Sequence, residues 1–137
     1  MRYLLDTNVI CEATAKAPDP HVLEWLEENS DESALSALTL GEIWKGLHMM
    51  PMGKRRDSIS SWAEGLETDF KDVILPIELD TLKVWAKFYA GNESKGLNLV
   101  LIDSLLSATA LTFGLTVVTR NTRDFPPEIP TLNPWLK

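Results

Sequence analysis

Residues 3–10 read YLLDTNVI, an apolar run that stops abruptly at Asp6. The apolar residues before Asp6 predict a short buried strand, and the residues after it begin a helix. Asp and Asn often stand at such junctions, because their side chains accept hydrogen bonds from backbone N–H groups. Asp6 therefore has a local explanation as a turn or cap. A role of Asp6 in catalysis or metal binding would require other carboxylates to lie close to it in the folded protein.

Strand and helix signals alternate along the rest of the chain. Short apolar runs predict further strands at residues 34–38, 72–77 and 115–119. Helical signals lie at residues 9–16, 21–30, 39–50, 56–70, 79–90 and 103–114. This alternation favours an α/β fold with a central, mostly parallel sheet flanked by helices. No repeat, low-complexity tract or linker divides the chain, so we expect a single domain over residues 1–137.

Three of these helices carry apolar stripes at helical spacing, which we expect to face the core. The stripes are Leu40, Ile43, Trp44 and Leu47 in the first, Ile59, Trp62, Ala63, Leu66 and Phe70 in the second, and Leu82, Trp85, Ala86 and Tyr89 in the third. Near the end of the chain, Trp135 is expected to anchor the last residues to this core.

The composition fits one compact domain, since 45% of the 137 residues are hydrophobic. The single cysteine, Cys11, cannot form an intramolecular disulfide. The first apolar run is too short for a signal peptide, and no segment is long enough to span a bilayer. We therefore expect a cytoplasmic protein without a membrane segment. The net charge of −7 argues against a broad nucleic-acid-binding surface, because phosphate contacts need Lys and Arg.

Four acidic residues stand at predicted junctions, and each has an ordinary explanation when taken alone. Asp6 and Asp103 lie where an apolar run meets a helix, which is a capping position. Glu42 fits a capping box in which Thr39 is the cap. Asp124 follows the last clear strand and reads as a turn residue.

Taken together, the same acids indicate a site. In a parallel sheet the carboxyl ends of the strands meet at one edge, and ligands bind there. Asp6 and Asp124 follow predicted strands, while Glu42 and Asp103 lie early in helices that begin near that edge. Carboxylates that converge repel one another unless a cation is present. Mg²⁺, which binds oxygen ligands, relieves this repulsion and keeps sites for phosphate oxygens.

Other chemistries have less support in the sequence. The two histidines, His21 and His48, both fall in predicted helices, so a Ser–His–Asp or Cys–His site is not expected. No G-x-x-x-x-G-K-[ST] or G-x-G-x-x-G phosphate loop occurs. Cys11 reads as a small, buried apolar residue.

The motifs LLDTNVI, ALTLGEIWKG, IDSLLSATAL, TVVTRNTRDF and LNPW, in this order over nearly the whole chain, resemble PIN-domain ribonuclease toxins of the VapC type. The resemblance is strongest to the FitB-like branch of these type II toxin–antitoxin proteins. It implies a parallel α/β sandwich that binds Mg²⁺ or Mn²⁺ through an acidic cluster and cuts RNA. It also implies a homodimer that is silenced by a small antitoxin.

The resemblance carries functional roles to particular residues. Asp6, Glu42 and Asp103 match the first three acids of the family, as both catalytic residues and metal ligands. The fourth acid commonly stands where this chain has Asn121, and here an acid follows at Asp124. We therefore assign Asn121 to the metal ligands and Asp124 to the catalytic acids, and leave open which of them serves as the fourth ligand.

Two polar residues near the acids receive supporting roles from the same resemblance. Thr119 matches a hydroxyl position that orients water, and Asn8 is expected to support the loop through hydrogen bonds. If the family's chemistry applies, water attacks the phosphodiester with the help of one or two metal ions. The products then carry 5′-phosphate and 3′-hydroxyl ends.

Basic residues are scarce, and five of them are candidates for RNA contact: Lys54, Arg55, Arg56, Arg120 and Arg123. For the first three, a solvated helix start explains the charges equally well. An acidic cleft also suits a basic tail or helix of an antitoxin. Two alternatives to the RNA-cleaving toxin stay open: a non-catalytic module of the same fold, and a metal-dependent nuclease that acts on DNA.

Overall fold

The computed structural model describes residues 1–136, which form a five-stranded parallel sheet with helices on both faces. The strands lie in the order β3-β2-β1-β4-β5. Their bounds are β1 Tyr3–Leu5, β2 Ser33–Ser36, β3 Ile74–Leu75, β4 Thr116–Val118 and β5 Thr131–Leu132. The predicted α/β class with a parallel central sheet is confirmed, and β5 forms one edge of this sheet.

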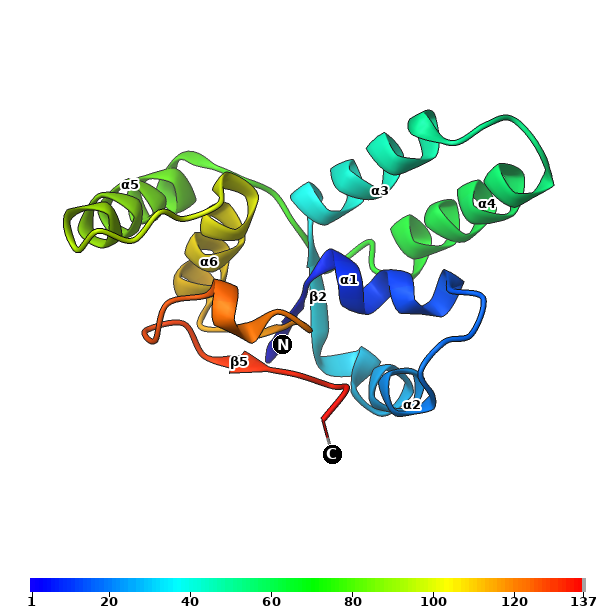
Figure 1. Cartoon of the computed structure of the whole chain (residues 1–137), viewed down its shortest axis with the longest axis horizontal. Coiled ribbons are helices and arrows are strands. Elements are labelled where there is room, and N and C mark those ends of the chain that lie inside the picture. The colour runs from blue at the N-terminus through cyan, green and yellow to red at the C-terminus, as the bar shows by residue number, and fades with distance from the viewer. Residues whose placement is uncertain (137) are drawn as a thin grey trace.

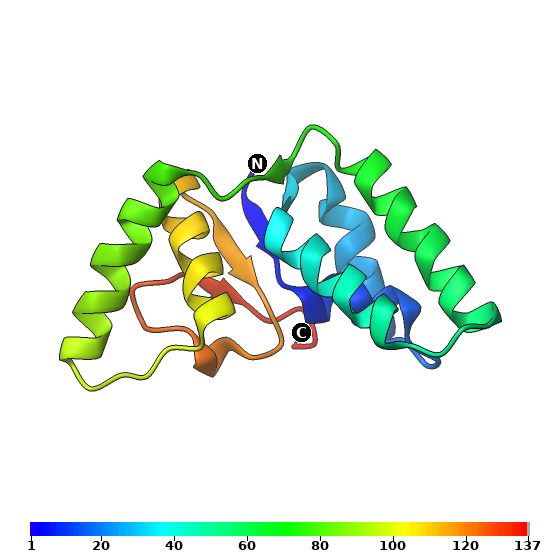
Figure 2. The ribbon, with the colours of Figure 1, turned by 90° about the horizontal axis from the view of Figure 1, so that it is seen from above.

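Six α-helices surround this sheet (Figures 1 and 2). Their bounds are α1 Thr7–Ile10, α2 Pro20–Asn29, α3 Ala37–Met49, α4 Lys54–Asp69, α5 Leu79–Ser94 and α6 Leu101–Phe113. Short 3₁₀ turns span Cys11–Thr14, Ser30–Glu32 and Thr122–Asp124. Figure 1 shows α1 to α4 on one side of the sheet and α5 and α6 on the other. Within residues 1–136, no helix has the length and apolar character needed to cross a membrane.

Successive residues of β1 point to opposite faces of the sheet, and each face has its own core. Tyr3 and Leu5 pack with residues of α1 to α4, whereas Leu4 packs with residues of α5 and α6. All three side chains are buried. The central strand is therefore apolar throughout, as expected for a parallel strand covered on both sides.

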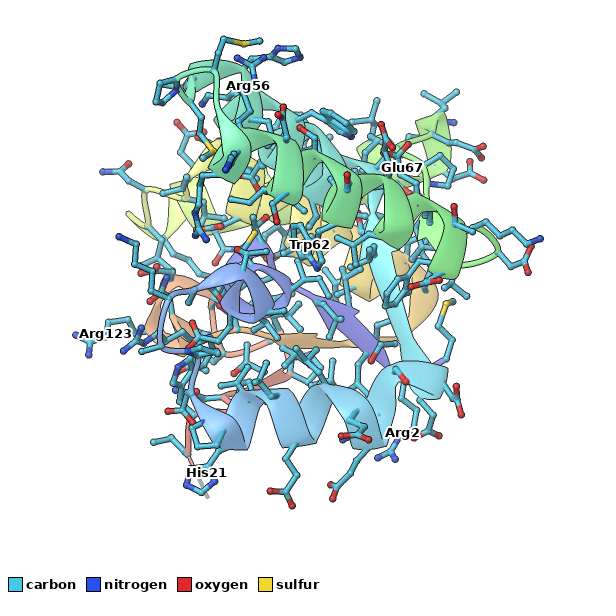
Figure 3. The ribbon with its side chains drawn as sticks, turned by 90° about the vertical axis from the view of Figure 1, so that its right-hand side faces the viewer. Arg2, His21, Arg56, Trp62, Glu67 and Arg123 are labelled. Atoms are coloured by element: carbon cyan, nitrogen blue, oxygen red, sulfur yellow. The ribbon has the colours of Figure 1, made fainter. Side chains whose placement is uncertain are left out.

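The stripe predicted for α4 is confirmed, because Ala63 and Leu66 are buried and the other members pack against the same core. Figure 3 shows Trp62 beneath α4, between this helix and α1. The stripe predicted for α5 is wrong in part. Leu82 is 39% exposed, and the residues that α5 buries are Thr81, Phe88 and Asn92. The helix is rotated relative to the prediction because its contact with α6 decides which face is covered.

The capping box predicted for Glu42 is also wrong. Helix α3 begins at Ala37, and the side chain of Ser36 caps it by accepting a hydrogen bond from the Leu38 amide at 3.1 Å. Thr39 is fully enclosed within the first turn. Glu42 therefore lies in the second turn of α3, free of any capping role.

The strand order places a topological switch point between β1 and β4. The chain runs from β1 outward through β2 to β3, then returns to pair β4 with the other side of β1. In open parallel sheets the crevice at such a point, at the carboxyl ends of the strands, is where ligands bind. Asp6 follows β1 and Thr119 follows β4, so both residues stand at this crevice.

Candidate functional site

Asp6 is held in one orientation by hydrogen bonds to both of its carboxylate oxygens. Oδ1 accepts from the Thr7 amide at 2.8 Å, which caps α1. Oδ2 accepts from the Thr119 hydroxyl at 2.8 Å and from the Asn8 side-chain amide at 3.3 Å. Only 9% of Asp6 is exposed. The capping explanation and a fixed carboxylate at the crevice are thus both true of this residue.

Thr119 and Asn8 connect the loop after β1 with the loop after β4. The buried Thr119 hydroxyl donates to Asp6 and accepts from the Asn121 amide at 3.1 Å. Oδ1 of Asn8 accepts from the Arg120 amide at 3.2 Å. Asn8 therefore supports the loop, as expected. The hydroxyl of Thr119 is buried and donates to the carboxylate of Asp6, while the water-orienting role that the resemblance implies stays a prediction.

Glu42 faces the same crevice from α3. Its carboxylate accepts a hydrogen bond of 2.6 Å from the Thr7 hydroxyl. This contact joins the start of α1 to the middle of α3 and turns Glu42 toward Asp6. Sequence reasoning missed Thr7, although its place directly after Asp6 at a strand end is a signal that could have singled it out.

Asp103 lies in the first turn of α6, opposite the other acids. Its pKa is raised from 3.8 to about 6, first by burial and then by the charges of Asp6, Asp124 and Glu42. The structure therefore brings all four predicted acids into one electrostatic neighbourhood, although they come from four separate elements. Asp124 belongs to the 3₁₀ turn Thr122–Asp124 and is exposed.

The charges of two of these acids also affect Cys11. Burial, Glu42 and Asp6 together raise the pKa of its thiol to about 11. A thiol with such a pKa is protonated near neutral pH and is a poor nucleophile. The structure thus agrees with the sequence-based view that Cys11 serves packing.

The acids form an open cluster that suits a hydrated ion. In the part of the chain that the structure describes, no three His, Cys, Asp or Glu side chains are grouped closely enough to enclose a metal ion by themselves. Mg²⁺ typically uses one or two carboxylates and keeps several waters, whereas structural zinc needs four protein ligands. The carboxylate and amide oxygens of these residues fit Mg²⁺ better than structural zinc.

The five predicted RNA-contact residues divide into two groups. Arg55 donates to the Thr14 carbonyl at 2.7 Å, and Arg56 donates to the Met50 carbonyl at 3.2 Å. Lys54 is exposed at the start of α4. Figure 3 shows Arg56 on α4, well apart from Arg123. Arg56 is thus not brought to Arg123, and both Arg55 and Arg56 hydrogen-bond to backbone carbonyls of the chain.

The other two candidates lie in the loop after β4. The guanidinium of Arg120 stands over the ring of Trp135, 5.1 Å from its centroid, and its backbone carbonyl accepts from the Asn133 side chain at 3.3 Å. The indole of Trp135 packs against the core formed with α1 to α4, as expected for an anchor. Arg123 is exposed and projects outward in Figure 3.

Comparisons with known proteins place this geometry in a family. The family model described as PIN domain matches residues 3–126. A VapC ribonuclease (Y4jK) of Sinorhizobium fredii is 36% identical, with 96% of both chains covered. The toxin FitB of Neisseria gonorrhoeae is 31% identical over 96% of this chain and 97% of its own length.

A solved structure agrees with these relatives. The crystal structure of FitAcB from Neisseria gonorrhoeae superimposes with a TM-score of 0.92 at 30% sequence identity, and it covers 98% of this chain and 99% of the matched chain. The family model extends from β1 to the loop that carries Asp124. The chain therefore belongs to the PIN-domain family, within which it is similar to VapC ribonucleases and FitB toxins.

Proposed function

We propose that this protein is a Mg²⁺-dependent endoribonuclease that acts as the toxin of a toxin–antitoxin pair. The observation that carries the proposal is the hydrogen-bonded arrangement at the switch point of the sheet, where Thr7 bonds to both Asp6 and Glu42 and Thr119 bonds to Asp6. The charges of Asp6, Asp124 and Glu42 add to burial in raising the pKa of Asp103. Like charges are assembled at such a cost where a cation and a phosphodiester are to be bound. The names of its relatives, VapC ribonuclease and FitB toxin, support the same activity.

Asp6, Glu42, Asp103 and Asn121 are the proposed metal ligands. Mg²⁺, or Mn²⁺ in its place, supplies neutralisation of phosphate charge and lowers the pKa of water when it is bound. Residues that hydrogen-bond to the proposed ligands hold them in place. Hydrogen bonds from Thr119 and Asn8 fix Asp6, and one from Thr7 fixes Glu42. Burial and the neighbouring charges both raise the pKa of Asp103, and a bound cation would offset these effects.

The proposed reaction is hydrolysis of a phosphodiester bond. The oxygen of a water molecule forms a bond to phosphorus, the bond from phosphorus to the 3′-oxygen breaks, and the 3′-oxygen leaves with a proton. The products carry 5′-phosphate and 3′-hydroxyl ends, with no use of the 2′-hydroxyl as nucleophile. In this proposal Asp124, which is exposed, accepts the proton of the attacking water.

We also propose two protein partners. The first is an antitoxin with a basic tail or helix, because four acids at an open crevice attract Arg and Lys side chains. The second is another copy of this chain. Apolar side chains at the beginnings of α5 and α6 are exposed, Leu79 by 65% and Leu101 by 56%, and a homodimer buries surfaces of this kind.

The decisive experiment compares cleavage of a small-RNA pool by the purified, antitoxin-free protein in Mg²⁺ and in EDTA. Asp6→Asn and Asp103→Asn serve as matched variants, since both keep the shape of the side chain. We expect cutting in Mg²⁺ only, and its loss in both variants. Circular dichroism checks that the variants are folded. Equal background in all samples would refute the proposal in favour of a binding module, and faster cutting of single-stranded DNA would identify a DNA nuclease.

A further inference from the structure

Two pockets each have one member of the acid cluster among their lining residues. The first, of about 420 Å³, has aliphatic walls from Leu38, Ile77 and Ile102, with Glu42 and Lys45 among its lining residues. Glu42 thus belongs both to the acid cluster and to this pocket. Lys45 lies three residues further along α3, and sequence reasoning did not single it out.

The second pocket, of about 450 Å³, contains Asp124 of the cluster among its lining residues. Its apolar walls include Leu99 and Phe125, and its polar lining residues are Asn98, Arg123 and Asp124. Asp124 is shared with the acid cluster in the same way as Glu42 is shared with the first pocket. Ile102 lines the first pocket and Val100 the second, so both pockets reach the start of α6, where Asp103 lies.

The chemistry of both pockets suits a nucleoside with its phosphate. Ligand pockets combine apolar walls with a few placed polar groups, and both volumes fall within their usual range of about 300–1,000 Å³. Proteins read single-stranded RNA by holding unstacked bases against apolar or aromatic side chains. Each pocket also contains one cation, Lys45 or Arg123, in a chain whose net charge is −7. A cation in each pocket favours the phosphate of a polyanion there.

We propose that the two pockets hold the nucleosides on either side of the scissile phosphate of a single-stranded RNA, and that Lys45 and Arg123 contact the adjoining phosphates. This inference rests on the proposed function, because it takes the acid cluster as the place where the phosphodiester is cut. A protein segment could also fill an apolar pocket. RNA is favoured because each pocket shares a carboxylate with the cluster and contributes a cation beside it.

Gly41 offers a clean way to fill the first pocket. It lines this pocket on α3, and a Cβ placed on it would meet no heavy atom within 4 Å. Gly41→Leu therefore introduces a Cβ that meets no neighbouring atom, and it alters none of the acids. Gly46, on the same helix, is equally unobstructed and is not among the lining residues. Gly46→Leu is thus a matched control for the effect of Leu on α3.

The first measurement is binding of a fluorescein-labelled single-stranded hexaribonucleotide of random sequence, followed by fluorescence anisotropy in Mg²⁺. All proteins carry Asp103→Asn, so that the RNA stays intact. We expect Gly41→Leu to weaken binding by about tenfold, the loss expected for one base contact, and Gly46→Leu to leave it unchanged. Equal affinities of the two variants would overturn the inference.

The second measurement tests the other pocket through its charge. Arg123→Gln should weaken binding and reduce the slope of log K against log salt concentration by about one. Arg2→Gln is the charge-matched control, because Arg2 is exposed and pairs with Glu32 at 3.4 Å, away from both pockets. Equal salt slopes for the two variants would remove Arg123 from the RNA path and overturn the two-pocket arrangement.

The two proposals fail in distinguishable ways. If the protein with Asp103 intact cuts RNA, but Gly41→Leu and Gly46→Leu cut and bind alike, the pocket inference fails and the proposed function stands. If RNA binds with the expected loss in Gly41→Leu but is never cut, the activity fails and the pockets stand. If Gly41→Leu changes only the sedimentation coefficient, the first pocket is covered by a second copy of the chain, and the inference is overturned.

Discussion

The hydroxyl of Thr7 donates a 2.6 Å hydrogen bond to the carboxylate of Glu42, 35 positions further along the chain. The adjacent amide of Thr7 bonds to Asp6 at 2.8 Å. One residue therefore sets the orientation of two acids, through its backbone for the first and its side chain for the second. This arrangement makes Thr7 a positioning residue for the proposed metal site.

Removing this hydroxyl should lower activity with little effect on the fold. We expect Thr7→Val to reduce metal affinity or cleavage about 10–100-fold, the usual cost of losing a residue that orients a metal ligand. Thr7→Ser keeps the hydroxyl and should restore most of the activity. Titration with Mn²⁺, followed by calorimetry, separates metal affinity from cleavage. Full activity and metal affinity in Thr7→Val would show that Glu42 does not need this contact.

Thr119 should matter for stability as well as for the site. Its hydroxyl is completely buried and bonds to Oδ2 of Asp6. Thr119→Val keeps the shape but leaves a buried carboxylate oxygen with one donor fewer, which costs about 1–3 kcal/mol in the free energy of unfolding. Urea unfolding measures this loss. Thr119→Ser is the control that keeps the hydroxyl, and an unchanged midpoint for Thr119→Val would contradict the argument.

The cap of α3 can be assigned by a pair of substitutions. Ser36 accepts from the Leu38 amide, so Ser36→Ala should cost about 1 kcal/mol or somewhat more in stability. Thr39→Ser keeps the hydroxyl that a capping box requires and loses only a buried methyl group. If Thr39 were the cap, Ser36→Ala would be nearly neutral. Thermal unfolding of the two variants at one pH distinguishes the two assignments.

The sequence pattern predicted Thr39 as the cap of α3, whereas the cap is Ser36. A capping box and a Ser followed by a helix look equally good in the stretch from Ser36 to Glu42. The choice depends on where β2 ends, and β2 ends at Ser36 because its pairing with β3 reaches that residue. The spacing of residues within one short stretch does not predict which distant strand pairs with it, or how far that pairing extends.

The face of α5 was missed for a similar reason. Apolar spacing predicted Leu82 and Ala86 as core residues, but both are exposed, and Thr81 and Phe88 are buried. An apolar stripe predicts that one face of a helix is buried, but it does not identify the neighbouring element that buries it. Which neighbour covers it depends on the packing of α5 against α6. The strand ends and the acids that follow them were predictable, because the parallel sheet itself aligns them at one edge.

Metal binding should be visible as stabilisation of the folded protein. An ion that binds only the folded state raises stability by RT ln(1 + [L]/Kd), about 2.7 kcal/mol at a hundredfold excess over Kd. We expect Mg²⁺ or Mn²⁺ to raise the Tm of the wild-type protein, and to raise it less in Asp6→Asn. A Tm that is unchanged by either metal at millimolar concentration would argue against the metal site. Unchanged shifts in Asp6→Asn would place the site elsewhere.

The free energy of unfolding should change with pH because Asp103 has different pKa values in the folded and unfolded states. The pKa of this residue is about 6 in the folded protein, above its ordinary value of 3.8. Between these two values the folded state binds more protons at Asp103 than the unfolded state does. The contribution of Asp103 to the free energy of unfolding therefore falls as the pH rises from about 4 to about 6, and it stays constant above.

Asp103→Asn removes this titration and gives the matched comparison. In EDTA, the variant should equal or exceed the wild-type protein in stability at neutral pH, because one repelling charge is gone. Its advantage should shrink as the pH falls toward 4, because the carboxyl of the folded wild-type protein becomes protonated and no longer repels the other acids. Urea unfolding across this range measures the difference. A variant that is much less stable than wild type at neutral pH would mean that Asp103 serves mainly as a cap for α6, with little repulsion from Asp6, Asp124 and Glu42.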